Sequence, residues 1–258
     1  MIAQIKFGGG DALVDFSMPI DISCILSNKQ PNPLAFFVDA PKFEPLMVGR
    51  FVGSVAAGGA CNCEVLTLTP HCQGTHTECI GHITLERHAI HDALKTFMFE
   101  ASLITVLPQK YFGGEPHQAQ DLVITKEMLE AQMIDFKGNA LVVRTLPNAE
   151  NKQTQCYSGN NPPYFTAEAT GYLAQVGVAH LLTDLPSVDK EDDGGLLAAH
   201  HAYWCYPHNP RKNATITELI FVPNSVADGR YLLNLQIASL DTDASPSKPV
   251  LYAIKPNK

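Results

Sequence analysis

Apolar segments with strand character alternate with helical segments along this chain, and that alternation limits the fold more than any other feature of the sequence. Residues 140–144 and 178–182 are short apolar runs, which are typical of buried strands. Between them, residues 166–175 have helical spacing and begin with a threonine suited to an N-cap. Residues 125–131 predict a second helix with the same kind of start. This order of elements predicts the α/β fold class.

Prolines interrupt the pattern in one long segment. Residues 28–45 hold four prolines, so an irregular loop is expected there. Long loops in compact domains are often functional, and this one could cover a binding site, reach a neighbouring subunit or be a surface excursion. Pro162-Pro163 marks a turn, but composition does not change across it, which predicts a single domain over residues 1–258. Further strands are expected at residues 3–7, 13–16, 64–69, 103–107, 216–222, 231–237 and 250–254.

Composition and charge exclude several classes of protein. The formal net charge is −8 and no lysine or arginine cluster occurs, so nucleic acid is not an expected partner. No run approaches the roughly 20 apolar residues that a membrane-spanning helix needs. The first residues do not form a secretory signal, and the seven cysteines are scattered. Reduced thiols in a cytoplasmic protein are therefore expected.

The segment HCQGTHTECIGH concentrates three histidines and one glutamate in twelve residues. Zinc and similar divalent ions take nitrogen and carboxylate ligands arranged around one point. His76 and Glu78 are two residues apart, so on a strand they face the same side. His71 can return to that side if the chain bends, and Gly74 supplies the freedom to bend. These three side chains are candidate metal ligands, whereas His82 is a candidate for proton transfer.

Spacing alone leaves other interpretations of this segment open. The chain has ten histidines, and a polar loop with solvated histidines would give the same pattern. A thiolate metal site at Cys61 and Cys63 fits poorly, because structural zinc sites usually separate their cysteines by roughly two to four residues. Small buried hydrophobes are the expected role of the cysteines. No Gly-x-Ser-x-Gly motif is present to anchor a Ser-His-Asp triad.

A second candidate cluster lies far downstream. Glu218 is placed in an apolar strand, where an unpaired carboxylate is costly, and it therefore needs a positive partner. His200 and His201 form a pair at the expected end of a helix. The alternative is an exposed histidine pair and a glutamate that faces solvent. His180, in an apolar strand, is expected to be a hydrogen-bonded core residue, and Asp184 is a candidate outer-shell residue.

The chain around the histidine-rich segment resembles the cyclase-like metal-dependent hydrolase family, whose best-known members are bacterial kynurenine formamidases. HCQGTHTECIGH is similar to the family's H-x-G-T-H-x-D-x-P-x-H signature. Residues 15–17 are similar to the family's opening Asp-Leu-Ser, and residues 140–145 to its buried strand that ends in Arg-Thr. Residues 183–189, TDLPSVD, are similar to its Asp-x-Pro-Ser-x-Asp loop. The resemblance extends from about Val14 to the C-terminus.

Three positions depart from the signature. One extra residue separates His71 from the Gly-Thr pair, Glu78 stands where the family usually has aspartate, and Ile80 stands where it usually has proline. The longer side chain of glutamate either offsets the extra residue or moves the carboxylate.

The resemblance implies a compact α/β domain of the swivelling β/β/α kind, with a mixed, partly barrel-like sheet. It implies one or two zinc or manganese ions per chain and a homodimer or homotetramer. It favours His200 over His201, and Glu78 is the residue best placed to bridge two metals, because a carboxylate has two oxygens. The implied metal ligands are His71, His76, Glu78, His200 and Glu218.

The implied activity is hydrolysis of a small amide by metal-activated water, with Glu78 and His82 as catalytic residues. Water on such a metal is acidic enough to give a hydroxide that attacks a carbonyl, and His82 would pass a proton to the leaving amine. The most specific expectation is an arylformamidase, which converts N-formylkynurenine to kynurenine and formate in tryptophan catabolism. The alternatives are a hydrolase or cyclase for another small lactone, ester or amide, and a metal-free binding protein on the same scaffold.

Overall fold

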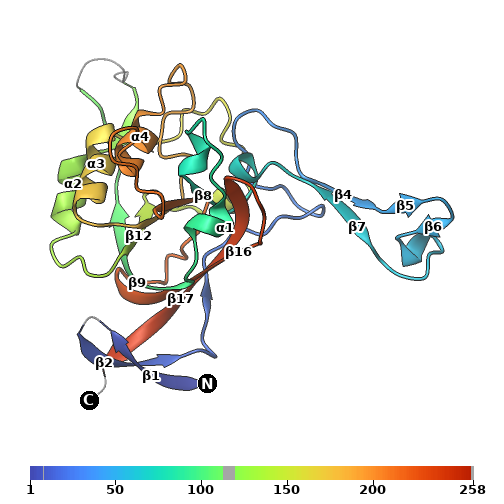
Figure 1. The fold of residues 1–258 in the computed structure, drawn as a ribbon, viewed down its shortest axis with the longest axis horizontal. Coiled ribbons are helices and arrows are strands. Elements are labelled where there is room, and N and C mark those ends of the chain that lie inside the picture. The colour runs from blue at the N-terminus through green and yellow to red at the C-terminus, as the bar shows by residue number, and fades with distance from the viewer. Residues whose placement is uncertain (8, 113–119, 257–258) are drawn as a thin grey trace.

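The computed structural model describes residues 1–7, 9–112 and 120–256, and its centre is a barrel-like sheet (Figure 1). Seven strands form a closed ring, because the last strand of the sheet also pairs with β8. Four neighbouring strands of the ring are parallel and the other pairings are antiparallel. The expected α/β fold with a mixed, partly barrel-like sheet is therefore confirmed. In order round the ring the strands are β17 (Ala244–Pro256), β16 (Gly229–Ile237), β9 (Met98–Val106), β12 (Ala140–Thr145), β14 (His180–Thr183), β15 (Thr215–Glu218) and β8 (His76–Cys79).

Shorter elements surround the ring. Strands β1 (Ile2–Phe7), β2 (Gly10–Asp15) and β3 (Ile20–Asp21) extend the main sheet beyond β17. A small sheet joins β10 (Gln109–Lys110), β11 (Leu122–Ile124) and β13 (Tyr164–Phe165). Two ribbons, β4 (Lys42–Pro45) with β7 (Glu64–Thr67) and β5 (Met47–Val48) with β6 (Phe51–Val52), lie to one side of the body. The α-helices are α1 (Ile90–Ala93), α2 (Lys126–Gln132), α3 (Ala167–Gln175) and α4 (Ala198–Trp204).

Strand β12 shows how the sequence builds two packed layers. Alternate residues of a strand point to opposite faces. Leu141 and Val143 pack in the cluster that includes residues of α2, α3 and α4. Ala140 and Val142 pack in a second cluster, to which every strand of the ring except β15 contributes. Burial of each large apolar side chain contributes about 1.5–3 kcal/mol, so a strand buried on both faces anchors the ring.

The two helices expected from threonine N-caps are confirmed. The side chain of Thr125 accepts a hydrogen bond from the backbone N–H of Met128, and Thr166 does the same for Ala169. Each cap satisfies one N–H group that the first turn of a helix leaves unpaired. Helix α3 packs against α4, and this contact helps to fix the position of His200.

Three expectations about boundaries were wrong. The strand expected to reach residue 222 ends at Glu218, because Leu219 adopts a left-handed φ of 53° that no regular strand contains. His200 and His201 do not end a helix but occupy the third and fourth positions of α4. The loop expected over residues 28–45 becomes strand β4 at Lys42. No helix in the described part of the chain is long and apolar enough to cross a membrane.

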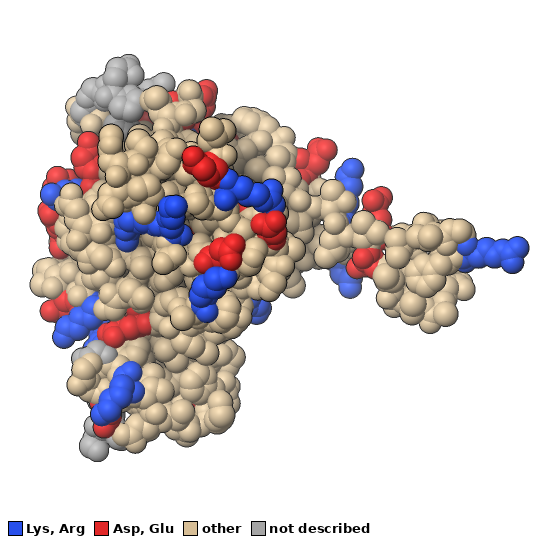
Figure 2. Space-filling view, in the orientation of Figure 1, with Lys and Arg blue, Asp and Glu red and all other residues tan. Residues whose placement is uncertain are grey.

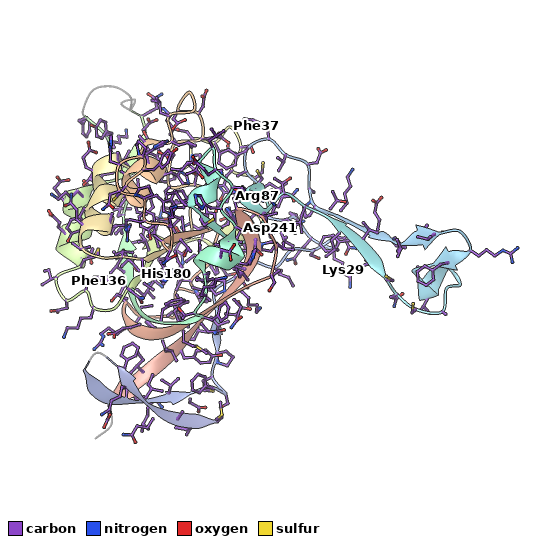
Figure 3. The ribbon with its side chains drawn as sticks, viewed as in Figure 1. Lys29, Phe37, Arg87, Phe136, His180 and Asp241 are labelled. Atoms are coloured by element: carbon purple, nitrogen blue, oxygen red, sulfur yellow. The ribbon has the colours of Figure 1, made fainter. Side chains whose placement is uncertain are left out.

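His180 is a hydrogen-bonded core residue, as expected, and no candidate metal group of the described residues contains it. Its side chain lies within the main body of the protein (Figure 3), with Nδ1 2.9 Å from the Thr215 hydroxyl and its ring 4.0 Å from that of Phe99. Burial, together with the charge of Arg211, lowers the pKa of His180 to about 4 from an ordinary value of 6.5.

This lowered pKa predicts a loss of stability in mild acid. The unfolded chain takes up a proton at His180 near pH 6.5 and the folded protein only near pH 4, so stability falls as the pH drops between these values. Between pH 7 and pH 5 we expect wild type to lose about 2 kcal/mol of unfolding free energy through this residue. Urea unfolding of wild type and His180→Asn at both pH values measures this difference. The exposed His208→Asn serves as control, and equal pH slopes for wild type and His180→Asn would contradict the prediction.

Candidate functional site

Strand β8 brings the second half of the histidine-rich segment to one face of the ring. His76 and Glu78 are fully buried, and His76 pairs in register with Glu218 on β15. Nε2 of His76 lies 3.2 Å from Oε2 of Glu218, while Nδ1 lies 3.1 Å from the carbonyl oxygen of Gly74. The other carboxylate oxygen of Glu218 accepts a hydrogen bond from the N–H of Val188 at 2.9 Å. The two oxygens of Glu218 therefore face a histidine ring and a backbone N–H, so the side chain does not point into bulk solvent.

The extra residue before the Gly-Thr pair is accommodated by a bend. A short 3₁₀ turn over Pro70–Cys72 is followed by Gly74, whose φ of 70° is left-handed. A side chain at Gly74 would also meet Leu26, since a Cβ there would lie 2.6 Å from its side chain. The bend places Nδ1 of His71 2.9 Å from Oε2 of Glu78. The carboxylate of Glu78, whose side chain is longer than the aspartate usual in the family, therefore remains within reach of His71.

Helix α4 supplies the histidine from the second half of the chain. Nε2 of His200 lies 3.0 Å from Oε1 of Glu78, and Nδ1 lies 2.5 Å from a carboxylate oxygen of Asp189. Asp189 also accepts hydrogen bonds from the N–H groups of Ala199 and His200, which fixes the ring. His201 faces elsewhere, with Nδ1 3.4 Å from the carbonyl oxygen of Tyr206. The structure thus brings His200, and not His201, to the cluster.

Two acidic residues of the cluster were not among the predicted site residues. Oδ2 of Asp243 lies 2.7 Å from Nε2 of His71 and 3.6 Å from Nδ1 of His82. Asp189 closes the TDLPSVD segment, so the resemblance contained a signal for it. Asp243 precedes the last strand, and only the pairing of β17 with β8 brings it to the histidines. Pairing between strands that are distant in the sequence cannot be predicted from the local spacing of residues.

The hydrogen bonds of the cluster fit a metal centre. One ring nitrogen of each of His71, His76 and His200 is held by an oxygen, and the other faces Glu78 or Glu218. In metal sites such an outer oxygen fixes the ring so that the second nitrogen points at the ion. Nε2 of His76 and Oε2 of Glu78 are buried without an aligned hydrogen-bond partner among the described residues. Because buried polar groups are almost always satisfied, a cation between them explains both atoms.

Electrostatics favour a cation at the same point. Burial alone would raise the pKa of Glu78, but the charges of His82 and His200 hold it well below its ordinary value. Burial opposes the charging of His71, yet hydrogen bonds to Asp243 and Glu78 raise its pKa to about 10. The carboxylates therefore favour the protonated forms of His71 and His200, the two histidines whose pKa they raise, when no metal is bound. Metal binding must release these protons.

His82 occupies the solvent side of the cluster. Its side chain is 28% exposed, and Nε2 lies 4.0 Å from Oε2 of Glu78. Its ring stacks on that of His71 at a centroid distance of 4.1 Å. Three groups in the described residues have donor atoms close enough together to share one ion, and two of them include His82. They are His71 with His76 and Glu78, His71 with His82 and Asp243, and Glu78 with His82 and His200. The role of His82 as a proton shuttle, and not as a metal ligand, therefore stays a prediction.

A cavity of about 320 Å³ opens onto the cluster. This volume lies within the range of about 300–1,000 Å³ that is typical of small-molecule sites. His71, His82 and His200 line its floor, and Phe36 from the proline-rich loop lines its wall. The loop over residues 28–45 thus does reach the edge of the candidate site.

Two other residue groups considered from the sequence lie outside this cluster. Asp184 accepts hydrogen bonds from Thr145 and Lys152, and neither of these residues lines the site cavity. None of these hydrogen bonds joins Asp184 to a candidate ligand, and its outer-shell role stays a prediction. Cys61 and Cys63 lie between β6 and β7 in the chain. No candidate metal group in the described residues contains a cysteine.

The contacts of His200 and His201 predict different effects for two neighbouring substitutions. His200→Ala removes the nitrogen that faces Glu78, so we expect metal affinity to fall by more than the roughly 10–100-fold that loss of an outer-shell partner costs. His201→Ala should leave affinity unchanged, because its ring faces Tyr206. Zinc titration followed by elemental analysis compares the two variants. Equal losses in both would remove His200 from the ligand set.

Fold and site together define a barrel-like α/β protein with a buried carboxylate–histidine centre. A family described as putative cyclase matches residues 14–190, and the chain belongs to that family. Within it, the chain is similar to bacterial kynurenine formamidases. That of Bacillus thuringiensis (strain Al Hakam) is 33% identical over 199 residues, which are 76% of this chain and 82% of the relative. That of Bacillus cereus (strain ATCC 10987 / NRS 248) is 24% identical over 244 residues, 93% and 97% of the two chains.

Solved structures agree with this fold. A potential metal-dependent hydrolase with cyclase activity superposes with a TM-score of 0.64 at 15% identity, over 93% of this chain and 99% of the other. Isatin hydrolase A from Ralstonia solanacearum superposes with a TM-score of 0.65 at 14% identity, over 92% of both chains. At this identity the likeness concerns the fold.

Proposed function

We propose that this protein is a metal-dependent hydrolase of small amides, and most specifically an arylformamidase that converts N-formylkynurenine to kynurenine and formate. The observation that carries the proposal is the position of Glu78. It is fully buried, and its two oxygens face His71 and His200, which come from opposite halves of the chain. A carboxylate with this double contact is suited to bridge two cations. The similarity to kynurenine formamidases supports the choice of substrate.

The proposed ligands are His71, His76, Glu78, His200 and Glu218. A zinc or manganese ion held by them would act as a Lewis acid on the amide carbonyl and lower the pKa of water. His82, at the solvent side, would move a proton at Nε2 to the leaving amine. Asp243 lies 3.6 Å from the other ring nitrogen of His82, so it would orient that ring.

The cavity wall suits an aromatic amino acid. Phe36 and Leu197 offer apolar surface near the histidines, and Lys190 and Glu191 lie at the same cavity. Oε2 of Glu191 accepts a hydrogen bond from the N–H of Gly159, whereas Oε1 is buried with no hydrogen-bond partner among the described residues. A buried carboxylate oxygen without a donor favours a cationic group, such as the ammonium of an amino-acid substrate. N-formylkynurenine has both an aromatic ring and such an ammonium.

The test combines metal analysis with a substrate panel. Protein purified without chelator should contain one to two equivalents of zinc or manganese, following the ligand count. It should hydrolyse N-formylkynurenine with a higher kcat/KM than formanilide, a phenyl ester or a lactone. A metal-free protein that does not respond to added zinc or manganese would overturn metal dependence. Metal-dependent turnover of a lactone or ester in preference to the formamide would overturn the substrate and leave the hydrolase.

We also propose a cytoplasmic location. All seven cysteines are free, and two of them, Cys61 and Cys156, are exposed. Exposed thiols persist in a reducing compartment.

A further inference from the structure

One ion pair is buried at the end of the barrel that carries the candidate site. On the face of the molecule shown in Figure 2, lysine and arginine side chains lie on the surface near acidic ones, which is the usual place for charged groups. Lys152 and Asp184 differ, because their side chains are 12% and 0% exposed and Nζ lies 2.8 Å from Oδ2. Removing two charges from water is costly, and well-packed apolar residues are often equally stable in such a place. Stability alone therefore does not explain this pair.

The pair joins the ends of two neighbouring parallel strands. Asp184 directly follows β14, and its carboxylate accepts hydrogen bonds from the backbone N–H and the hydroxyl of Thr145, the last residue of β12, at 2.9 and 2.8 Å. Nζ of Lys152 donates to the carbonyl and hydroxyl oxygens of Thr145 at 2.7 and 2.9 Å. Each of the three Nζ protons therefore has an acceptor, and a fully satisfied buried network of this kind is rigid. Glu218 ends β15, the next parallel strand of the ring, so the network and the site share one end of the barrel.

The charge of Lys152 keeps Asp184 in its role as an acceptor. Burial raises the pKa of Asp184, whereas the charge of Lys152 and the hydrogen bonds from Thr145 act in the opposite direction. Without the ammonium group the buried carboxylate would take up a proton, because an isolated buried charge is costly. A protonated carboxyl group accepts weaker hydrogen bonds than a carboxylate does. Loss of Lys152 therefore loosens the contact between Asp184 and β12.

Asp184 is also the first residue of a segment that supports the site. This segment, residues 184–191, is called the site segment. The N–H of Val188 donates to Glu218 at 2.9 Å. The carboxylate of Asp189 lies 2.5 Å from Nδ1 of His200. Three further members of the site segment line the cavity, namely Ser187, Lys190 and Glu191. The ion pair thus holds the start of a segment whose later residues reach two of the proposed ligands.

The contacts of the site segment with the ligands leave little room for displacement. Hydrogen bonds weaken once they lengthen beyond about 3.2 Å or bend, so a shift of roughly 1 Å would break both of them. Backbone hydrogen bonds from Leu219 to the carbonyl of Leu185 and from Phe165 to that of Val188 hold the middle of the segment. The ion pair adds a tie to β12 at its start. The position of the site segment on the end of the barrel consequently depends on Asp184.

We propose that Lys152 and Asp184 are positioning residues, whose ion pair sets the place of the site segment and thereby the orientation of Glu218 and His200 toward a metal. The inference rests on the proposed function and deepens it. It assigns to the site two residues whose own side-chain hydrogen bonds, in the described part of the chain, reach no proposed ligand. Such an indirect role is effective, because a misplacement of about 1 Å that originates far from the chemistry can lower a rate by roughly 10²-fold.

Hydrogen exchange of the metal-free protein tests the placement without using activity. Lys152→Met keeps an unbranched side chain and removes the charge. Peptides that span residues 184–191 should exchange at least about 10-fold faster than in wild type, because a loosened segment opens more often. Peptides from β9 should keep their wild-type rates. Unchanged exchange in the site segment would overturn the proposal, whatever reaction the protein catalyses.

A second ion pair, on β12 itself, provides a matched control. The side chain of Arg144 is 9% exposed, and Nη2 lies 2.9 Å from Oδ1 of Asp228. The other hydrogen bonds of its guanidinium go to Thr105 and to residues 223–226. None of these residues belongs to the site segment or lines the site cavity. Arg144→Met should therefore lower the free energy of unfolding but leave exchange of the site segment and zinc affinity as in wild type.

Zinc affinity, measured by competition with a chromophoric chelator, is the second readout. Lys152→Met should bind zinc about 10–100-fold more weakly than wild type, the range for loss of a residue that supports a metal ligand. Equal losses in Lys152→Met and Arg144→Met would show an effect of stability alone and overturn the proposal. If wild type itself binds no zinc, the proposed function fails, and the exchange experiment still decides whether the ion pair places the site segment.

A double substitution keeps the experiment decisive if Lys152→Met does not fold. Lys152→Met with Asp184→Asn removes both charges, so no unpaired ion is left in the interior, and it preserves an acceptor oxygen for Thr145. Its circular dichroism should be that of wild type. Exchange in residues 184–191 should remain about 10-fold faster than in wild type, because the tie through the ammonium group is absent. Wild-type exchange and wild-type zinc affinity in the double variant would overturn the proposal.

Discussion

Replacement of Glu78 by glutamine is expected to lower turnover by roughly 10²- to 10⁴-fold and to weaken metal binding in parallel. Glutamine keeps the shape of the side chain but loses its charge and one acceptor oxygen. Both oxygens face histidine rings, with Oε1 3.0 Å from Nε2 of His200 and Oε2 2.9 Å from Nδ1 of His71. Removal of one partner from a buried charged set costs about 3–5 kcal/mol, which corresponds to that range of rate or affinity.

Elemental analysis and initial rates, measured on the same preparation, check this expectation. Glu86→Gln makes the same change at an exposed position four residues beyond His82 and should behave as wild type. Glu78→Asp is informative in a different way, since it restores the residue usual in the family but shortens the reach across the bend at Gly74. The Glu78→Asp variant should keep the negative charge and bind part of the metal that wild type binds. Full metal content and full turnover in Glu78→Gln would remove Glu78 from the centre.

His82→Ala should separate turnover from metal binding. We expect a loss of turnover of roughly 10²- to 10⁴-fold, the usual contribution of a proton-transfer group, with most of the metal retained. The reason is position, because His82 is 28% exposed whereas His76 is fully buried against Glu218. His76→Ala should therefore lose the metal as well as the activity.

The control for this pair is His208→Ala, which removes an exposed histidine and should change neither quantity. Rates at saturating substrate and metal content after dialysis are the two measurements. If His82→Ala loses its metal as completely as His76→Ala, then His82 is a ligand, as two of the groups around it permit geometrically.

Local sequence predicted much of the fold because its strongest signals are local ones. The caps at Thr125 and Thr166 depend on contacts three residues away, and both helices begin there. The shared face of His76 and Glu78 follows from the two-residue repeat of a strand. The approach of His71 depends on the bend at Gly74, which a glycine makes possible.

Residues whose position depends on distant pairing were harder to predict. Asp243 meets His71 and His82 only because β17 lies beside β8. The end of β15 depends on the left-handed backbone of Leu219. The carbonyl oxygen of Leu219 accepts a hydrogen bond from the hydroxyl of Thr75, a residue in the first half of the chain. Strands β5 and β6 escaped prediction because each is short and lies in residues 46–63, where glycine and alanine carry little strand propensity, whereas β7 lies within the strand expected at residues 64–69.

The pairing of β8 sets the order in which the site can form during synthesis. His76 and Glu78 lie opposite Pro246 and Ala244 of β17 on one edge of β8, and opposite Glu218 and Ile216 of β15 on the other. At about 5–20 residues per second, a ribosome makes β17 roughly 10 to 30 seconds after β8. Until then β8 can pair only with β15, which precedes β17 in the chain, and its other edge has no partner. Assembly of the centre consequently waits for β17, and a premature stop before Asp243 removes that carboxylate and leaves one edge of β8 open.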